Sequence, residues 1–155
     1  MPRYAASLDI RATHETVWMH LSDVLDWPKW LPTVSAVDAV RGAALNPGSR
    51  FLIRQPRLKP QVWTVTDIQP GKSFTWEAGS PGTLLVASHT VIPTGPMSCR
   101  VSLVFRFHGI VGVVFGVILG SLTRKYLATE AASLRQVSEA GDPGGHLRLE
   151  VVAAP

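Results

Sequence analysis

The stretch CRVSLVFRFHG, residues 99–109, decides the fold, because apolar and polar side chains alternate along it. Successive side chains of a strand point to opposite sides of a sheet, so this pattern predicts one dry face and one wet face. Such one-sided burial is typical of an antiparallel sheet. The apolar face carries Cys99, Val101, Leu103, Phe105 and Phe107. The other face carries Arg100, Ser102, Val104, Arg106 and His108, and we expect His108 to be exposed.

Residues 110–140 follow this strand and predict one long helix. Its second half is amphipathic, with apolar residues at three- and four-residue steps: Leu127, Ala131, Leu134 and Val137. The uncharged stretch GIVGVVFGVILGSL, residues 109–122, is shorter than the roughly 20 residues of a membrane span. Its glycines recur every four residues at Gly112, Gly116 and Gly120. We interpret this stretch as a buried helix face that lies close against a sheet.

Upstream, six further extended segments are separated by turns rich in Gly and Pro: 3–11, 34–41, 50–55, 61–68, 73–79 and 83–92. Two short helices are expected between the first and second segments. The first covers residues 14–23, with Thr13 as its N-cap. In the stretch VLDWPKWLP, residues 24–32, Asp26 is expected to cap a second turn that holds Trp27 and Trp30.

These elements predict an α+β fold in which one long helix packs on a sheet of about seven strands. If the sheet curls around the helix and the short helices plug one end, a pocket forms between them. The 155 residues suit a single domain, which we place at residues 1–140. Residues 141–155 form a tail that is either disordered or an extra strand. The tail leaves strand exchange in a dimer open, so both a monomer and a homodimer remain.

The amino-acid composition excludes some classes of function. The sequence is 46% hydrophobic and only 17% charged, so either the core is large or apolar side chains line a cavity. The net charge of +4 is spread along the chain, which argues against a nucleic-acid partner. A single cysteine, Cys99, excludes an internal disulfide. The N-terminal stretch MPRYAASLDIRAT lacks the apolar core of a signal peptide, so we expect a cytoplasmic protein.

The sequence also resembles a known superfamily. The stretches that carry the resemblance are IRATHETVWMHLSDVLDWPKWLP, GSRFLI, VTDIQPGKSFTWE and HTVIPTG, followed by the long helix that a glycine begins. They are similar to the START-like (SRPBCC, Bet v 1-like) superfamily of polyketide cyclases/dehydrases and lipid-transport proteins, over nearly all of residues 1–140. The resemblance implies a helix-grip fold, with a curved antiparallel sheet wrapped around the C-terminal helix. Members include cyclases, lipid carriers and chaperone co-activators, so this fold does not name the activity.

Aromatic side chains gather on the elements that would surround the pocket. We expect a hydrophobic ligand to contact Trp18, Trp27, Trp30, Phe51, Trp63, Trp76, Phe107 and Phe115. On the long helix, Leu119, Thr123 and Tyr126 complete the predicted lining. The alternative is a solid core with no usable cavity.

His89 is the candidate catalytic residue, because it interrupts an apolar strand and imidazole transfers protons near neutral pH. The alternative is a hydrogen-bonded core histidine. No metal site is expected, since the chain has no His-x-x-x-His and no cysteine pair. The basic cluster Arg50, Arg54, Arg57 and Lys59 either holds an anionic headgroup or membrane surface at the pocket entrance or is simply solvated.

We therefore expect a carrier or sensor of a hydrophobic small molecule such as a lipid, an isoprenoid or quinone, or a polyketide, with no cofactor. A cyclase- or dehydratase-like enzyme that uses a cavity histidine is the alternative. A second alternative is a protein-interaction module, which predicts a filled core and an exposed apolar patch. A pure carrier predicts an apolar lining throughout, whereas catalysis requires a polar group that points into the cavity.

Overall fold

The computed structural model describes residues 2–140, so the predictions for the tail lie outside the described residues. The strands are β1 (Arg3–Ile10), β2 (Ala36–Arg41), β3 (Arg50–Arg54), β4 (Gln61–Gln69), β5 (Ser73–Ser80), β6 (Thr83–Gly95) and β7 (Ser98–His108). The helices are α1 (His14–Ser22), the 3-10 helix η1 (Val24–Lys29), α2 (Ile110–Ile118) and α3 (Gly120–Ala140). Every predicted strand is present within three residues of its expected bounds.

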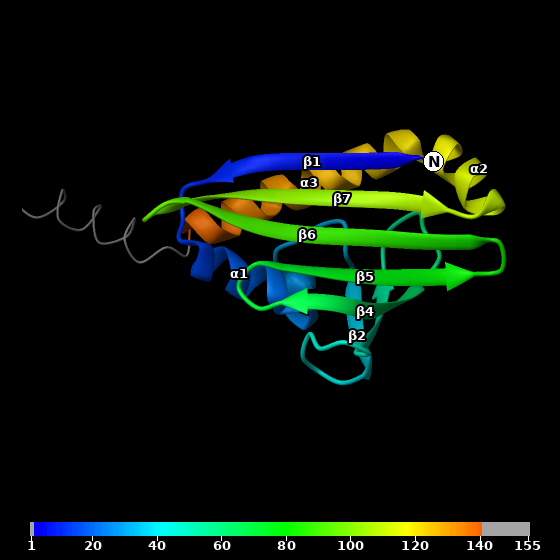
Figure 1. The fold of residues 1–155 in the computed structure, drawn as a ribbon, viewed down its shortest axis with the longest axis horizontal. Coiled ribbons are helices and arrows are strands. Elements are labelled where there is room, and N and C mark those ends of the chain that lie inside the picture. The colour runs from blue at the N-terminus through cyan, green and yellow to red at the C-terminus, as the bar shows by residue number, and fades with distance from the viewer. Residues whose placement is uncertain (1, 141–155) are drawn as a thin grey trace, which may run out of the picture.

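The seven strands form one curved antiparallel sheet in the order β1-β7-β6-β5-β4-β3-β2. The long helix α3 lies along one face, behind β1 and β7 in the view of Figure 1. Helices α1 and η1 cover the same face nearer β4 and β5. This arrangement confirms the predicted α+β helix-grip architecture.

Alternation in β7 separates the faces as expected. Four of the five predicted inward residues are buried, and Phe105 is half-buried. His108, which we expected to be exposed, is half-buried instead. The register places it opposite Leu84, at the point where the chain turns from β7 into α2. The corner therefore leaves partly covered a side chain that alternation alone assigns to solvent.

The prediction of one continuous helix over residues 110–140 is wrong. The chain forms two helices, α2 and α3, which are bent by 73° to each other at Leu119. Tyr4 explains the break, because its hydroxyl donates a 2.6 Å hydrogen bond to the Gly116 carbonyl. A side chain inserted into the helical ladder is a recognised cause of sharp kinks. Gly120 leaves room for the Tyr4 ring, since a Cβ there would lie 2.5 Å from the Tyr4 oxygen.

The expectation that the stretch 109–122 is a buried helix face is also wrong. In α2 the buried residues are Gly112 and Gly116, and the large apolar side chains point outward. The close approach to the sheet is real, but only the glycines make it. Among residues 2–140 no single helix is long and apolar enough to cross a membrane; α2 and α3 together have the length and composition, with the bend between them.

The two short helices hold one end of the interior closed. Thr13 caps α1 as predicted, since its hydroxyl accepts a 3.2 Å hydrogen bond from the Thr16 amide. The second helix begins at Val24, two residues before the predicted cap Asp26. Asp26 instead forms a 2.6 Å ion pair with Lys29 inside the helix. The result is a compact 3-10 helix that projects Trp27 toward the sheet.

Candidate functional site

A small cavity of about 50 Å³ lies between the inner face of the sheet, η1 and α3. A water molecule occupies roughly 30 Å³ in the liquid, so this space takes one or two waters. Its walls are Trp27, Val34, Ile53, Gln55, Trp63, Trp76, Ala87, Ser88, His89, Leu103, Val104, Phe105, Leu127 and Glu130. The interior is therefore almost filled by its own aromatic and aliphatic side chains, which is the core that the protein-interaction alternative predicts.

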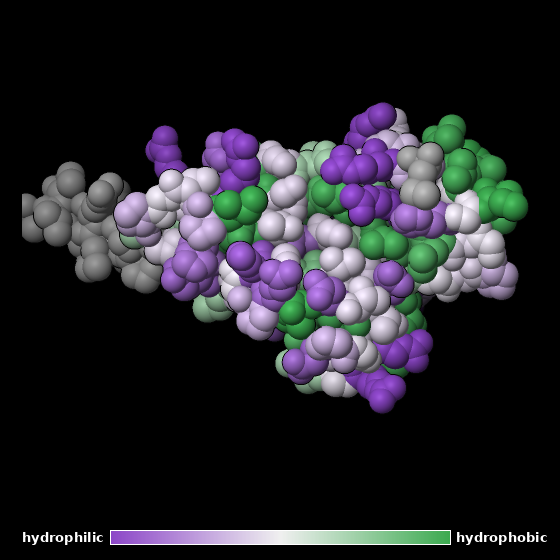
Figure 2. Space-filling model, viewed as in Figure 1, coloured by the Kyte–Doolittle hydropathy of each residue, from purple (hydrophilic) through white to green (hydrophobic). Residues whose placement is uncertain are grey.

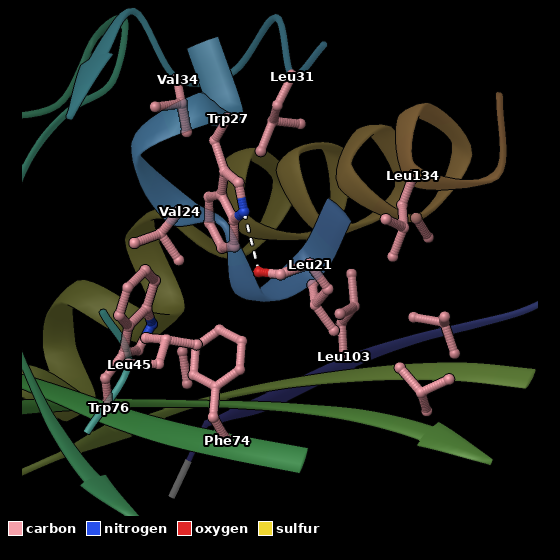
Figure 3. Close-up of a cluster of buried hydrophobic side chains, with 14 of the residues drawn as sticks. Leu21, Val24, Trp27, Leu31, Val34, Leu45, Phe74, Trp76, Leu103 and Leu134 are labelled. Carbon is pink, nitrogen blue, oxygen red and sulfur yellow. Dashed lines mark hydrogen bonds between the residues drawn. The ribbon is translucent and has the colours of Figure 1, made fainter. Parts of the chain in front are cut away.

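Trp27 closes this inner cavity from the side of η1. Its indole is 2% exposed, and Nε1 donates a 3.1 Å hydrogen bond to the Leu21 carbonyl (Figure 3). The ring meets Trp76 from β5 at a centroid distance of 5.4 Å in an edge-on arrangement. Trp76 in turn lies 5.6 Å from Trp63 of β4. Three of the five tryptophans thus form one contiguous aromatic wall.

The polar feature of the cavity is a pair formed by His89 of β6 and Glu130 of α3. His89 Nε2 lies 3.0 Å from Glu130 Oε1, within hydrogen-bonding distance. The side chains are only 5% and 14% exposed, respectively. Such partly desolvated polar groups are costly unless they are paired, so each partner needs the other.

Aromatic rings hold the His89 imidazole in place. Phe74 stacks on it at 4.3 Å with an interplanar angle of 9°, and Trp76 meets it edge-on at 5.7 Å. Nδ1 is buried and has no hydrogen-bond partner among the described residues. If Nε2 carries the proton toward the carboxylate, Nδ1 keeps a free lone pair that accepts a hydrogen bond or a proton.

Sequence reasoning found His89 but missed Glu130. The signal was present in the helical spacing, since Glu130 stands three residues after Leu127 and four before Leu134. Both leucines are buried, so a residue between them at this spacing lies on or beside the buried face. A carboxylate on the sheet-facing side of a helix needs a partner, and His89 is that partner.

A second space, an outer cleft of about 280 Å³, is lined by residues from three segments of the chain. Its lining is Pro32, Thr33, Pro56, Arg57, Leu122, Lys125, Tyr126 and Thr129. Chain neighbours of four of these residues line the inner cavity, in the pairs Thr33/Val34, Pro56/Gln55, Tyr126/Leu127 and Thr129/Glu130. Residues 32–34, 55–57 and 122–130 therefore contribute to the lining of both spaces, and we call these three segments the wall.

Tyr126 ties this wall together. Its hydroxyl donates a short hydrogen bond to the Pro56 carbonyl, which joins α3 to the loop between β3 and β4. The two segments are 70 residues apart in the sequence. Within residues 2–140, no other side chain that lines the cleft forms a hydrogen bond between two of the three segments.

The other predicted lining residues lie outside the inner cavity. Trp18, Trp30 and Phe51 belong to the surrounding core, and Phe107 packs on Tyr4 at 6.1 Å. Phe115 is 47% exposed, because α2 bends away from the cavity. Leu119 caps α2, and Thr123 donates to the Leu119 carbonyl within the helices. The predicted lining thus brings together Trp27, Trp63, Trp76 and His89, with Tyr126 in the outer cleft.

Arg57 alone of the predicted basic cluster lines the outer cleft. The other three basic residues, Arg50, Arg54 and Lys59, are exposed on β3 and the loop that follows it. Lys125 joins Arg57 from the first turns of α3. The cleft mouth therefore carries two cations.

Other reactive groups are poorly placed for chemistry. Cys99 is fully buried, and burial raises the pKa of its thiol to about 11, with a smaller contribution from the Asp9 carboxylate. A thiol with so high a pKa is a poor nucleophile. In residues 2–140, no three His, Cys, Asp or Glu side chains come together as metal ligands would.

With this geometry described, comparison with known proteins places the chain. Residues 1–139 match the family described as polyketide cyclase / dehydrase and lipid transport. The chain belongs to this family. No functionally curated protein matches the sequence.

Solved structures of this superfamily share the fold. The Zhui aromatase/cyclase from Streptomyces sp. R1128 is similar with a TM-score of 0.74 at 13% identity, over 90% of this chain and 98% of the other. Norcoclaurine synthase from Thalictrum flavum has a TM-score of 0.71 at 15% identity, over 90% of this chain and 87% of the other. A START superfamily protein from Mycobacterium smegmatis has a TM-score of 0.66 at 16% identity, over 87% of this chain and 98% of the other. At these identities the likeness establishes the fold and not the activity.

Proposed function

We propose that this family member binds a hydrophobic small molecule in its interior and orients it through one hydrogen-bonding group at His89. The observation that carries the proposal is the His89–Glu130 pair, set in a wall of aromatic rings. A core that needed only packing would gain nothing from a partly desolvated carboxylate. A quinone, a polyketide or a lipid with a carbonyl or hydroxyl group offers both an apolar body and a partner for Nδ1 of His89.

The inner space of about 50 Å³ is too small for such a ligand, so the wall has to move for the ligand to enter. The inner cavity of about 50 Å³ and the outer cleft of about 280 Å³ are separated by chain neighbours. Joined, the two spaces reach the lower end of the range for small-molecule sites, roughly 300–1,000 Å³. Release of the Tyr126–Pro56 hydrogen bond frees α3 from the β3–β4 loop, so we assign the ligand route to the outer cleft.

Catalysis is the second candidate, and the free Nδ1 of His89 favours it. With Glu130 holding Nε2, His89 would take a proton from an activated carbon or hydroxyl of the bound molecule. Removal of a proton next to a ketone leaves an enolate, and the imidazolium returns the proton afterwards. Glu130 then stabilises the imidazolium that forms transiently.

The first experiment is native mass spectrometry of the purified protein, followed by organic extraction. A co-purified lipid, quinone or polyketide supports the proposal, and so does one equivalent of added menadione or palmitate. The double variant H89F/E130L removes both polar partners and keeps a ring to stack on Phe74. We expect it to weaken menadione binding at least tenfold, as measured by quenching of tryptophan fluorescence.

The matched control is D9N, which breaks the exposed Asp9–Arg100 ion pair on the outer face of the sheet. It should bind menadione as the parent protein does. A bare mass with no shift on adding either probe overturns the carrier function. For catalysis, the probe is deuterium exchange of the methylene protons of benzoylacetone, followed by NMR. Exchange no faster than in buffer, or unchanged in H89A, overturns the enzymatic alternative.

A further inference from the structure

Helix α2 carries the largest exposed apolar surface on the described residues. Seven of its nine residues are large hydrophobics left exposed: Ile110, Val111, Val113, Val114, Phe115, Val117 and Ile118. Ile110 is 86% exposed, Val117 71% and Ile118 69%. Figure 2 shows them as a continuous green tip at the end of the molecule. Contiguous apolar surface of this kind marks a docking site rather than scattered exposure.

In α2 the small residues face the protein and the large apolar residues face solvent. Gly112 and Gly116 face the protein, and a Cβ at Gly116 would lie 2.7 Å from Pro2 and 2.9 Å from Phe107. A surface helix normally turns its apolar stripe inward and its polar side chains to water. Here the stripe points away from the sheet, and no residue in 2–140 covers it. A partner from outside residues 2–140 is therefore needed to cover this apolar face.

The charge next to α2 is mainly positive. Glu77 lies two strands from Arg106 in the same register row, but between Glu77 and Glu130 the sequence has no carboxylate and contains Arg100, Arg106, Arg124 and Lys125. Arg106 stands directly opposite Arg3 in the β1–β7 register, and both are exposed. Like charges in such a pair repel each other unless an anion lies between them. At the far end of the same two strands, Arg100 is paired with Asp9.

Arg124 lies on α3, shortly after the bend that follows α2. Its guanidinium stacks over the Tyr4 ring at 5.0 Å, and Tyr4 is bonded to the α2 backbone. Hydrophilic residues accordingly border the green tip in Figure 2. The apolar helix thus has a cationic rim on the described residues, with three arginines: Arg3, Arg106 and Arg124.

We propose that α2 docks the protein on an anionic lipid bilayer, lying in the interface with its apolar face among the acyl chains. Nine residues make a helix about 13 Å long, and interfacial helices sink roughly 5–10 Å below the headgroups. The arginines of the rim then lie at the level of the lipid phosphates. The opposed Arg3 and Arg106, which form no ion pair within residues 2–140, then gain an anion.

Two other occupants fit less well. A second copy joined through α2 would bring two cationic rims together, which repel each other. The 15 residues that follow Ala140 would have to run back along the whole of α3, about 30 Å, to reach α2. A bilayer covers the whole apolar face at once and also matches the sign of the rim. Docking does not depend on the proposed function, although a bilayer is where a hydrophobic ligand would be exchanged.

The test is flotation of the full chain with vesicles of phosphatidylcholine containing 30% phosphatidylglycerol, compared with pure phosphatidylcholine. We expect binding to the anionic vesicles that weakens with salt. The variant I110Q/V117Q/I118Q should bind at least tenfold less. The matched control M19Q/V40Q/I92Q changes three exposed apolar residues elsewhere and should bind normally. Because all six side chains are exposed, both variants should keep the parental melting temperature.

A further variant, R3Q/R106Q, separates charge from apolar insertion. It should lose the preference for phosphatidylglycerol while α2 still inserts. Absence of parental binding to anionic vesicles, or equal binding by the α2 variant, overturns the proposal. A dimer in light scattering that the α2 variant abolishes, without vesicle binding, assigns the face to a second copy and also overturns it. Menadione binding measured on the same variants reports separately on the interior.

Discussion

Gly116 of α2 lies so close to Pro2 that a Cβ on the glycine would stand 2.7 Å from the proline ring. Phe107 of β7 lies on the other side, 2.9 Å from the same point. Real Cβ atoms essentially never approach so closely, so the start of the chain and α2 are in contact only because residue 116 lacks a side chain. This contact holds the exposed helix against the sheet.

Replacement of Gly116 by leucine should therefore destabilise the protein by about 1–3 kcal/mol, because overpacking forces backbone or ring shifts. The measurement is the free energy of unfolding in urea. Gly112→Ala is the control, since its Cβ would lie at an ordinary 3.4 Å from Thr83 Cγ2 and alanine favours a helix. Equal stability of the two variants would show that the contact with Pro2 yields at no cost.

Tyr126→Phe should loosen the wall between the outer cleft and the inner cavity. The variant loses the hydrogen bond to the Pro56 carbonyl, at a cost of about 1 kcal/mol in stability. We expect faster amide exchange at Gln55, Arg57, Leu58 and Lys59 and faster association of menadione. Thr129→Val is the control, because that hydroxyl lies in the same cleft but bonds the Lys125 carbonyl of its own helix. Identical exchange in the two variants contradicts the role of Tyr126.

Cys99 should resist thiol reagents in the folded protein. Its thiol is fully buried and has a pKa raised to about 11, so at pH 8 about one thiol in a thousand is ionised. We expect labelling by Ellman's reagent to proceed at the rate of unfolding and to become fast in 6 M guanidinium. Rapid labelling in buffer would mean that β7 opens locally at its N-terminal end.

His20 should make stability depend on pH. Burial lowers its pKa below the ordinary value of 6.5, against weaker opposing effects of Asp26 and Asp23. The folded state then binds fewer protons than the unfolded state just below pH 6.5, so the free energy of unfolding falls as the pH drops through this range. His20→Gln should lose less stability between pH 7.5 and pH 5 than the parent. Met19→Gln, at an exposed and non-titratable position of the same helix, should follow the parent curve.

Much of the fold follows from local pattern. Alternation along residues 99–108 and the turns between strands were sufficient for the sheet, because each strand meets only its neighbours. The helix break at Leu119 could not be predicted, since Tyr4 causes it from the opposite end of the chain. The uncharged stretch before the break is helical, as predicted, but its large apolar side chains are exposed where we expected them to be buried. Apolar composition indicates that a helix face avoids water, but not which partner covers it.

The sequence likewise identified only one of the two polar residues of the candidate site. His89 stood out because it interrupts an apolar strand, whereas Glu130 looked like an ordinary surface residue of an amphipathic helix. Their contact spans 41 residues and depends on how α3 is rotated against the sheet. Phe115 was misplaced for the same reason, because a helix of unknown rotation and direction cannot assign its side chains to a cavity.

Strand β1 pairs with β7 and with no other strand, and this pairing affects the order in which the chain folds. The first strand, Arg3–Ile10, has no partner until Ser98–His108 is available, and the Arg11 amide bonds the carboxylate of Glu139 across 128 positions. During synthesis β1 therefore cannot pair until the chain has been made through His108, and Arg11 cannot bond Glu139 until the end of α3 has formed. Contacts between residues so far apart in the sequence slow folding. Amides of β1 cannot gain protection before β7 exists.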